Sequence, residues 1–495
     1  MEPRPRHIII IGGGIIGTTT AYYLTRHPSW NPSIHHITLL EATTVASGAS
    51  GKAGGLLGLW AYPQCIVDLS YRLHAELAAE HGGAERWGYR RVTCGQISAK
   101  LKRDQLRRRK GGPNGVGANF GTPESKHRKP PRKSNTTPVS EKQPLTHENG
   151  SIPTLTPSNS SHSESSPDDC PDVKTQEEHD PRKEWHKLPK QDAAAAKLLH
   201  ESVLPPDLDW IDSSVVHEYA EMGLPGYTET AQVHPYKFTT AIAELAQQAG
   251  IVLRNNAKVT RIGLNAGKTA VSNVEYVDRT TNETLTLLGV TDVVVAAGPW
   301  TSTLVPQVKI DPLRVHSVVY SADVTPFAVF TNISLPGDWV PAHRAAKGQK
   351  RVHKGTVDPE FYARPNGEVY ACGEPDYDEQ LPETADLVPC DELQCDDMIS
   401  YIATVSPVLA SAPITAKQAC YIPQHVCPDE EGGPLVGPTS ISGLWVASGH
   451  TCWGIQNGPG TGKLMSEFIF EGMAKSANIS SLDPRQCRGT RAEEN

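Results

Sequence analysis

The chain has 495 residues, of which 38% are hydrophobic and 6% aromatic, and its formal net charge is −8. This length exceeds one ordinary domain, and the negative charge argues against nucleic-acid binding through bulk electrostatics. No apolar run approaches the roughly 20 residues of a membrane-spanning helix, so we predict none. The N-terminus has no signal-peptide pattern, and the 10 cysteines form no CxxC motif. We therefore expect a cytoplasmic protein without a disulfide framework or a metal site.

The chain opens with a pattern typical of a nucleotide-binding βαβ unit. Residues 7–11 (HIIII) are a β-branched run suited to a strand buried on both faces, and residues 18–26 predict a helix. Between them stands GGGIIG (12–17), which satisfies the GxGxxG pattern. A second predicted strand, 37–40, ends at Glu41. Strand, glycine turn, helix, strand and terminal acid in this order predict a dinucleotide-binding site.

Each of these positions has a physical task. Gly12 permits a tight turn, Gly14 lets the backbone approach a pyrophosphate, and Gly17 lets the helix pack closely on the strand. The helix N-terminus offers free N–H groups and a positive dipole to phosphate. Glu41 is placed to accept hydrogen bonds from ribose hydroxyls.

A run of small residues follows the second strand. The segment ASGASGKAGGLL (46–57) lets the backbone approach a second section of a long cofactor. Ser47 and Ser50 add hydroxyls for phosphate oxygens. A nicotinamide dinucleotide has no special need for such a segment here, so a longer cofactor is favoured.

Later segments repeat the theme of an apolar strand that ends in small residues. Residues 250–253, 257–260 and 291–300 (TDVVVAAGPW) predict returning strands of the same nucleotide-binding domain. Residues 443–450 (GLWVASGH) predict another strand, and the glycine-rich turn at 458–463 opens a helix. This second helix N-terminus can face an anionic or electron-rich ring edge.

Composition changes sharply near residue 100 and returns near 190. The segment 100–190 is rich in Ser, Pro, Gly and Lys, with a basic first part that includes KRDQLRRRK (102–110) and an acidic later part. It lacks the apolar area needed to offset its ordering entropy, so we predict a disordered insertion. Two interpretations stay open: a solvated loop, or a segment that binds a protein partner, an acidic surface or the nuclear import machinery.

Taken together, the motifs resemble the FAD-dependent amino-acid and amine oxidase superfamily, the group of D-amino-acid oxidase, glycine oxidase and sarcosine oxidase. GGGIIG, VVVAAGPW, GLWVASGH and GPGTGK carry the resemblance, which covers nearly all of the chain outside 100–190. In detail the chain is most similar to fungal FAD-dependent oxidoreductases. The resemblance implies an α/β fold: an FAD-binding Rossmann-type domain with a parallel sheet, and a substrate domain of mixed or antiparallel sheet with helices.

The resemblance also implies that each domain is assembled from separate chain segments. The expected FAD-binding segments are 1–85, 225–305 and 421–477. The expected substrate-domain segments are 86–99, 191–224 and 306–420, with 100–190 as the disordered insertion and 478–495 as a flexible tail.

The implied activity is oxidation of the C–N bond of an amino acid or secondary amine, with hydride transfer to flavin N5 and dioxygen as the expected electron acceptor. Two alternatives stay open. One is a dehydrogenase that passes electrons to a carrier. The other is a flavin-fold protein that acts mainly through protein interactions, for example in endosomal trafficking, through its insertion. The second alternative adds an endosomal or nuclear pool to the cytoplasmic location.

The resemblance assigns cofactor residues, and we expect FAD to be bound non-covalently. The expected contacts are Gly12, Gly14, Ile15, Ile16 and Gly17 at the pyrophosphate; Glu41 and Ala42 at the adenosine ribose; Ser50, Gly54, Gly55 and Leu56 along the ribityl chain and ring; Val259 at adenine; Ala297, Gly298 and Trp300 near the ribose or ring; and Gly449, His450, Trp453, Gly454 and Ile455 at the pyrimidine edge.

Substrate residues follow less directly from the resemblance. Arg364, before the PNGEVY segment, is the candidate for holding a substrate carboxylate, or else a structural arginine. Cys452 and Trp453 stand where many relatives have a small residue and His, which changes the surface over the flavin. Trp60 either caps the ring or packs in the core. Covalent attachment of flavin through Cys420 is the alternative to non-covalent binding.

Overall fold

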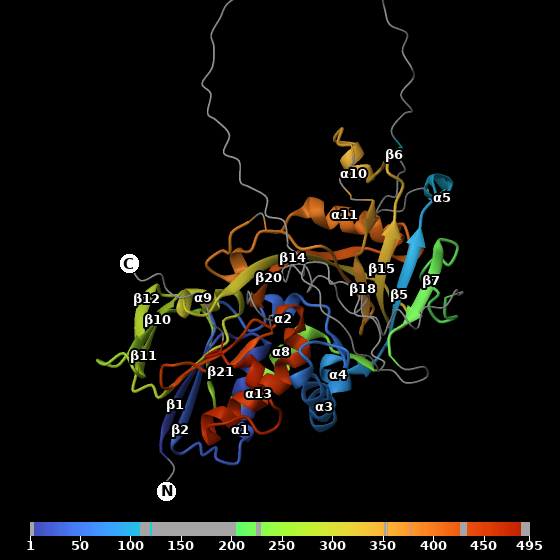
Figure 1. Ribbon diagram of the computed structural model, residues 1–495. Coiled ribbons are helices and arrows are strands. Elements are labelled where there is room, and N and C mark those ends of the chain that lie inside the picture. Colours follow the sequence, from blue (N-terminus) through green and yellow to red (C-terminus); the bar gives the residue numbers. More distant parts are fainter. Residues whose placement is uncertain are drawn as a thin grey trace, which may run out of the picture. The chain divides into compact units, whose positions relative to one another are not determined.

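The computed structural model describes residues 4–108, 119–120, 204–223, 229–350, 353, 355–377, 379–425 and 433–486. Most of the predicted insertion, 100–190, lies outside the described residues. Two large sheets with their covering helices, joined by smaller sheets, form the described chain (Figure 1). This agrees with the predicted fold class of a parallel-sheet domain joined to a mixed-sheet domain.

The first sheet has six strands in the order β21-β22-β13-β1-β2-β9. Its strands pair in parallel except β21, which is antiparallel to β22. The strands are β1 (Arg6–Ile11), β2 (His35–Leu40), β9 (Val252–Arg254), β13 (Asp292–Val295), β21 (Leu435–Pro438) and β22 (Leu444–Ser448). The strands predicted near 7–11, 37–40, 250–253, 291–300 and 443–450 are thereby confirmed.

Alternation along β1 explains how both faces of this sheet are covered. Ile8 and Ile10 pack against helices, whereas Ile9 and Ile11 pack against a second, smaller sheet. The helices are α1 (Ile15–Arg26), α3 (Gln64–His81), α8 (Pro235–Gln248) and α13 (Gly454–Glu471). The smaller sheet is β10 (Ala257–Leu264), β11 (Val271–Asp278) and β12 (Glu283–Leu288), all antiparallel. Residues 257–260 therefore lie in this covering sheet and not in the parallel sheet.

The second large sheet runs in the order β20-β14-β19-β18-β15-β5-β7, with β17 beside β15. Only β5 and β15 pair in parallel among these strands, so the sheet is mixed, as predicted. Its strands are β5 (Thr93–Lys100), β7 (Val216–Glu221), β14 (Ile310–Ser321), β15 (Phe327–Ser334), β17 (Thr356–Val357), β18 (Glu360–Arg364), β19 (Glu368–Cys372) and β20 (Ile414–His425). The predicted domain boundary at 420/421 falls inside β20.

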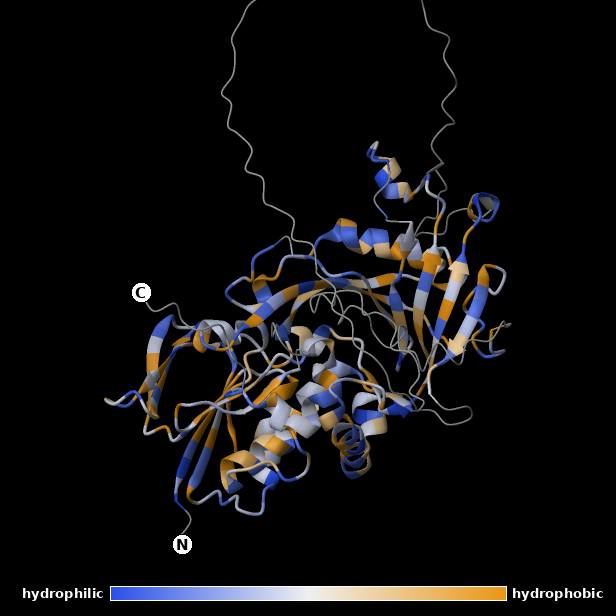
Figure 2. Ribbon diagram, in the orientation of Figure 1, coloured by the Kyte–Doolittle hydropathy of each residue, from blue (hydrophilic) through white to orange (hydrophobic). Residues whose placement is uncertain are grey.

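One face of this second sheet is covered by helices α11 (Glu392–Ala403) and α12 (Pro407–Ser411). Figure 1 shows α11 on the side away from the parallel-sheet domain, and Figure 2 shows hydrophobic and hydrophilic residues alternating along it. Met398, Ile399 and Ile402 of α11 pack on Val318 and Phe361 of the sheet. The opposite face is therefore free to line a site.

Short elements complete the described chain. The short strands are β3 (Leu56–Gly58), β4 (Arg90–Arg91), β6 (Asn119–Phe120), β8 (Thr230–Gln232) and β16 (Trp339–Val340). The short helices are α2 (Ala49–Lys52), α4 (Gly83–Trp87), α5 (Arg103–Arg108), α9 (Thr301–Leu304) and α10 (Ala342–Ala345), with 3-10 turns at Gly298–Trp300, Ala385–Leu387, Thr451–Trp453 and Ser480–Leu482.

Two segments expected to be disordered or flexible are packed in part. Leu101 and Leu106, at the start of the predicted insertion, are buried in the core under the second sheet. Ile479 and Leu482, in the predicted tail, are buried in the core around the helices. Burial of these apolar side chains offsets the ordering entropy of both short segments. Residues 487–495 lie outside the described residues.

Candidate active site

A cavity of about 920 Å³ lies between the carboxyl ends of the parallel strands and the uncovered face of the second sheet. Ile11, Leu40 and Ala296 line it from the first sheet, and Phe330 and Tyr362 line it from the second. The volume is near the upper end of the range of about 300–1,000 Å³ for ligand pockets. The site is therefore large enough for an extended cofactor and a small substrate.

The glycines of the first turn shape one end of this cavity. Gly12 has φ +110°, and a Cβ there would lie 2.4 Å from the Ala296 carbonyl oxygen. A Cβ on Gly17 would lie 1.9 Å from the Gly12 carbonyl oxygen, so Gly17 serves helix–strand packing and does not line the cavity. Gly14 does line it, at the N-cap of α1. Beside it, the Ile15 N–H donates to Ser50 Oγ at 2.9 Å.

Glu41 is held at the end of β2 by a local hydrogen-bond set. Its Oε2 accepts from the Gly13 N–H at 2.7 Å, and its Oε1 accepts from the Thr43 N–H at 2.8 Å and the Thr43 hydroxyl at 2.9 Å. Both Glu41 and Ala42 line the cavity. The carboxylate is thus oriented where the second strand ends, as the βαβ pattern predicts.

The structure brings most of the predicted cofactor residues to this one cavity. Those that line it are Gly12, Gly14, Ile15, Ile16, Glu41, Ala42, Ser50, Gly54, Gly55, Leu56, Val259, Ala297, Gly298, Trp300, His450, Trp453, Gly454 and Ile455. Gly17 and Gly449 do not. Gly449 has φ +86°, and a Cβ there would lie 2.8 Å from His425 Cβ, so it shapes the turn behind the wall.

The uncovered face of the second sheet supplies the other end of the cavity through strand register. On β18, the side chains of Glu360 and Tyr362 face the cavity, because alternate residues of a strand point the same way. Glu360 pairs with Cys372 of β19, and Tyr362 pairs with Tyr370. All four line the cavity, and sequence reasoning missed them. The alternation of polar and apolar residues in EFYAR could have predicted which side chains share one face of the strand. It could not have predicted that this face borders the cavity.

Aromatic rings form a continuous wall at this end. Trp60 lies 5.7 Å from Trp453 and 6.1 Å from Phe330, measured between ring centroids, and both contacts are edge-to-face. Phe330 lies 5.9 Å from Tyr362, which stacks on Tyr370 at 6.0 Å. All five line the cavity. Trp60 thus forms part of the wall, and its Nε1–H is buried without an acceptor among the described residues.

Three titratable residues border the middle of the cavity. Burial raises the pKa of Cys420 to about 11, against the opposing effect of Lys52, so the thiol stays protonated near neutral pH. Lys52 Nζ donates to the Ala419 carbonyl at 2.9 Å. Burial lowers the pKa of His450 to about 3, so its ring is neutral, and its Nε2 lies 2.9 Å from Thr461 Oγ1.

Arg364, the candidate for holding a substrate carboxylate or else a structural arginine, lies outside the cavity lining. It continues the face of β18 beyond Tyr362 but does not line the cavity. Its buried guanidinium donates to the Ala53 carbonyl and lies 4.6 Å from the Tyr370 ring centroid. The group therefore supports the segment that carries Gly54, because the register of β18 places it one step past the site.

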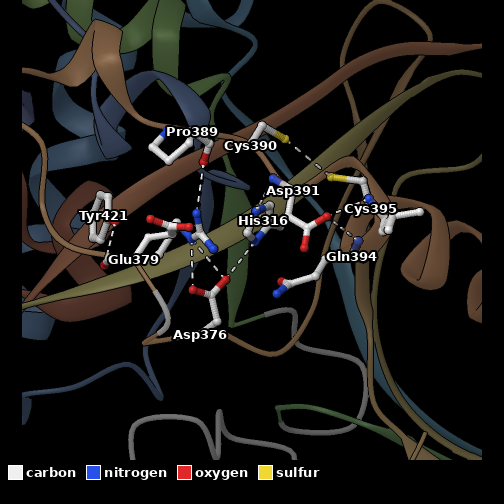
Figure 3. Close-up of polar contacts among 11 residues, drawn as sticks. His316, Asp376, Glu379, Pro389, Cys390, Asp391, Gln394, Cys395 and Tyr421 are labelled. Atoms are coloured by element: carbon white, nitrogen blue, oxygen red, sulfur yellow. Dashed lines mark hydrogen bonds and ion pairs between the residues drawn. The ribbon is translucent and has the colours of Figure 1, made fainter. Parts of the chain in front are cut away.

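A polar network holds the loop that closes one side of the cavity (Figure 3). Asp376 lies within residues 373–377, of which all but Asp376 line the cavity. The Nε of Arg314 donates to Asp376 at 2.9 and 3.1 Å, and His316 Nδ1 lies 3.4 Å from Asp376 Oδ2. His316 Nε2 accepts from the Asp391 N–H at 2.9 Å. Two strand residues of β14 thereby tie this loop to the start of α11.

Comparison with known proteins agrees with this geometry. Residues 7–134 and 175–468 match the family of FAD dependent oxidoreductases known as DAO. The chain belongs to this family. It is therefore an FAD-dependent oxidoreductase, as the sequence motifs indicated.

Two fungal relatives span nearly the whole chain, and their names class them as oxidoreductases. TDA3 of Saccharomyces cerevisiae is 34% identical over 526 residues, covering 97% of this chain and 94% of TDA3. C1F5.03c of Schizosaccharomyces pombe is 29% identical over 492 residues, covering 97% of this chain and 98% of that protein. Glycine oxidase from Geobacillus kaustophilus shares the fold, with a TM-score of 0.56, 17% identity and coverage of 98% and 100%.

The residues of the cavity fit FAD. Gly14 carries no side chain where it borders the cavity at the N-cap of α1, and the backbone N–H groups of that first helical turn suit a phosphate. Among the described residues, no cluster of His, Cys, Asp and Glu side chains is suited to a metal ion. The described helices include none long and apolar enough to cross a membrane.

Proposed function

We propose that this protein oxidises the C–N bond of an amine or amino acid, with non-covalently bound FAD and with dioxygen as the electron acceptor. When bound, FAD supplies the group that accepts a hydride from the substrate carbon. The observation that carries the proposal is the single cavity that joins the glycine turn of a nucleotide-binding domain to an aromatic-walled pocket.

Under this proposal the glycine-turn end of the cavity holds the nucleotide. Gly14 and the α1 N-terminus bind the pyrophosphate, Glu41 binds the adenosine ribose, and the Val259 backbone borders adenine. Their position on one wall of the cavity supports these assignments. Ser50 Oγ and the Ile15 N–H, already joined to each other, orient the backbone near the phosphates.

The aromatic end positions the substrate and keeps water away from it. Trp60, Phe330 and Trp453 form the wall against which a substrate carbon is held. Excluding water protects an imine product from hydrolysis until it leaves the site. Non-covalent cofactor binding is supported by Cys420, because a thiol with a pKa of about 11 is a poor nucleophile at neutral pH.

The test is the visible spectrum of the purified protein, followed by anaerobic mixing with amino acids and with secondary amines. We expect flavin absorption bands that bleach with one of these substrate classes. Bands that persist with every compound would contradict the proposed reaction, and protein without flavin after reconstitution would contradict the cofactor. Air-driven peroxide formation compared with dye reduction distinguishes an oxidase from a dehydrogenase.

A second candidate is a role through protein interactions at a cytoplasmic, endosomal or nuclear location. It is supported by the basic-then-acidic charge pattern of 100–190, which suits recruitment of a partner. The test removes residues 121–203 and follows both flavin reduction and the cellular location of a tagged protein. Relocation with unchanged flavin reduction would support this role, and unchanged location would count against it.

A further inference from the structure

We propose that the aromatic end of the cavity selects a positively charged amine without a carboxylate, and that Glu360 is the recognition group. This inference rests on the proposed function, because it names the substrate class of the same site. In it, the ammonium N–H groups of the bound substrate donate to the Glu360 carboxylate. Three observations lead to this assignment.

First, a buried carboxylate lines the cavity beside the aromatic wall. Glu360 is 6% exposed and lines the cavity from the first position of β18. The hydroxyl of Tyr362 donates to its Oε2 at 2.5 Å, which fixes the orientation of the carboxylate. Burying a carboxylate is costly, and a cationic ligand that reaches its oxygens recovers much of that cost.

Second, the walls around this carboxylate suit a cation. Tyr362 and Phe330 are edge-to-face neighbours, and Trp60 continues the wall to Trp453. Faces of aromatic rings attract ammonium groups, with Trp giving the strongest effect. A cation can therefore contact both the ring faces and the carboxylate in one small pocket.

Third, the described part of the lining has no side chain placed to bind the carboxylate of an amino-acid substrate. Among the described residues that line the cavity there is no arginine, and the lysines are Lys52 and Lys258. Lys52 donates to the Ala419 carbonyl, and Lys258 lies beside Val259 and pairs with Glu383 at 2.7 Å. A bidentate fork for an amino-acid carboxylate is therefore missing from this part of the chain. This favours an amine over an amino acid.

The experiment measures binding by calorimetry to the FAD-loaded full chain with three probes of one shape. tert-Butylammonium is the cation, tert-butanol is the neutral probe and pivalate is the anion. Neither tert-butylammonium nor tert-butanol can be oxidised at the tertiary carbon, because that carbon has no hydrogen. We expect the cation to bind at least tenfold more tightly than the other two. Glu360→Gln should remove this preference while leaving tert-butanol binding within twofold.

Glu374→Gln is the matched control, because Glu374 also lines the cavity but is exposed. It should change cation binding less than twofold. Unchanged cation binding in Glu360→Gln, or tighter binding of pivalate than of tert-butylammonium, would overturn the inference. Should Glu360→Gln fail to fold, the wild-type order of the three probes decides alone, with alanine as a fourth probe whose tighter binding would indicate an amino-acid site.

This readout is separate from the proposed reaction. Bleaching of flavin bands tests C–N bond oxidation, whereas calorimetry tests charge recognition with three tert-butyl probes that have no hydrogen on the tertiary carbon. Cation selectivity that depends on Glu360, in a protein whose flavin no amine reduces, would uphold the site and contradict the reaction. Flavin reduction by amines, with no effect of Glu360→Gln on any probe, would uphold the reaction and contradict the recognition site.

Discussion

At the residue scale, the site depends on a few positions where a side chain is either excluded or required. Gly12 and Gly17 are required because a Cβ on either would overlap a backbone oxygen. Gly14 differs, since its nearest neighbour would be the Ser50 hydroxyl at 3.0 Å and its open side is the cavity. Gly12 and Gly17 are therefore required by the fold, whereas Gly14 borders the cavity.

Gly14→Val should consequently impair FAD binding more than folding. The valine side chain would occupy the space that the pyrophosphate needs at the α1 N-terminus. We expect the FAD dissociation constant, measured by flavin fluorescence quenching, to be at least tenfold larger. The thermal midpoint of the FAD-free protein should change little. Gly267→Ala, at an exposed turn, should change neither. Equal FAD affinity in Gly14→Val would contradict the assignment of the pyrophosphate to this turn.

Arg364→Met tests whether this arginine supports the wall or binds substrate. Losing the donor leaves the Ala53 carbonyl unpaired, which costs about 1–3 kcal/mol in stability. We expect a lower thermal midpoint and several-fold weaker FAD binding, with the tert-butylammonium-to-pivalate affinity ratio unchanged. A selective loss of pivalate binding would instead restore the role in carboxylate binding.

At the element scale, buried hydrogen bonds join helices behind the cavity wall. His74 of α3 is fully buried, and its Nε2–H donates to the Ile455 carbonyl at 2.9 Å, in the first turn of α13. Ile455 also lines the cavity. Burial lowers the pKa of His74 to about 4, so the folded protein holds this ring neutral.

The neutral state of His74 makes stability depend on pH. Between the ordinary pKa of 6.5 and the folded value of about 4, the unfolded chain binds a proton that the folded chain does not. The contribution of His74 to the free energy of unfolding is thus fully present above pH 6.5. It falls as pH decreases, by about 2 kcal/mol at pH 5. His74→Asn should flatten the dependence of the unfolding free energy on pH between 7 and 5. His217→Asn, at an exposed position, should leave the slope as it is in the wild type.

The element scale also shows where sequence patterns were sufficient. HIIII, GGGIIG and the acid at the end of β2 lie within one short stretch of sequence with a recognisable spacing, so a local pattern predicts both their structure and their place at the cavity. β18 is different. Glu360 and Arg364 lie on the same face, yet only Glu360 reaches the cavity. That outcome depends on the register of β18 against β19 and on where the strand ends relative to Ala53.

At the scale of the whole molecule, the cavity is built from chain segments that are far apart in sequence. Residues near 12, 50, 260, 300, 360 and 450 meet around one space. A ligand that fills it contacts both large sheets, and it binds only to the folded chain.

FAD should therefore stabilise the whole described unit and not one domain alone. At a free FAD concentration of 100 times the dissociation constant, the expected gain is about 2.7 kcal/mol. The measurement is the thermal midpoint as a function of added FAD, followed by far-ultraviolet circular dichroism. Gly14→Val should show little gain at the same concentrations. Two separate transitions, of which FAD shifts only one, would contradict joint stabilisation.

The sequence by itself determined the fold class, the glycine turn at the cavity and the oxidoreductase family, because these depend on neighbouring residues whose spacing repeats the geometry of one βαβ unit. The tertiary structure decided which side chains of the second sheet face the cavity. Glu360, Tyr362 and Phe330 come from strands whose order in the sheet is not the order in the chain. A one-residue change of register would point each of these side chains into the core beneath α11. No local pattern could therefore predict that they line the cavity.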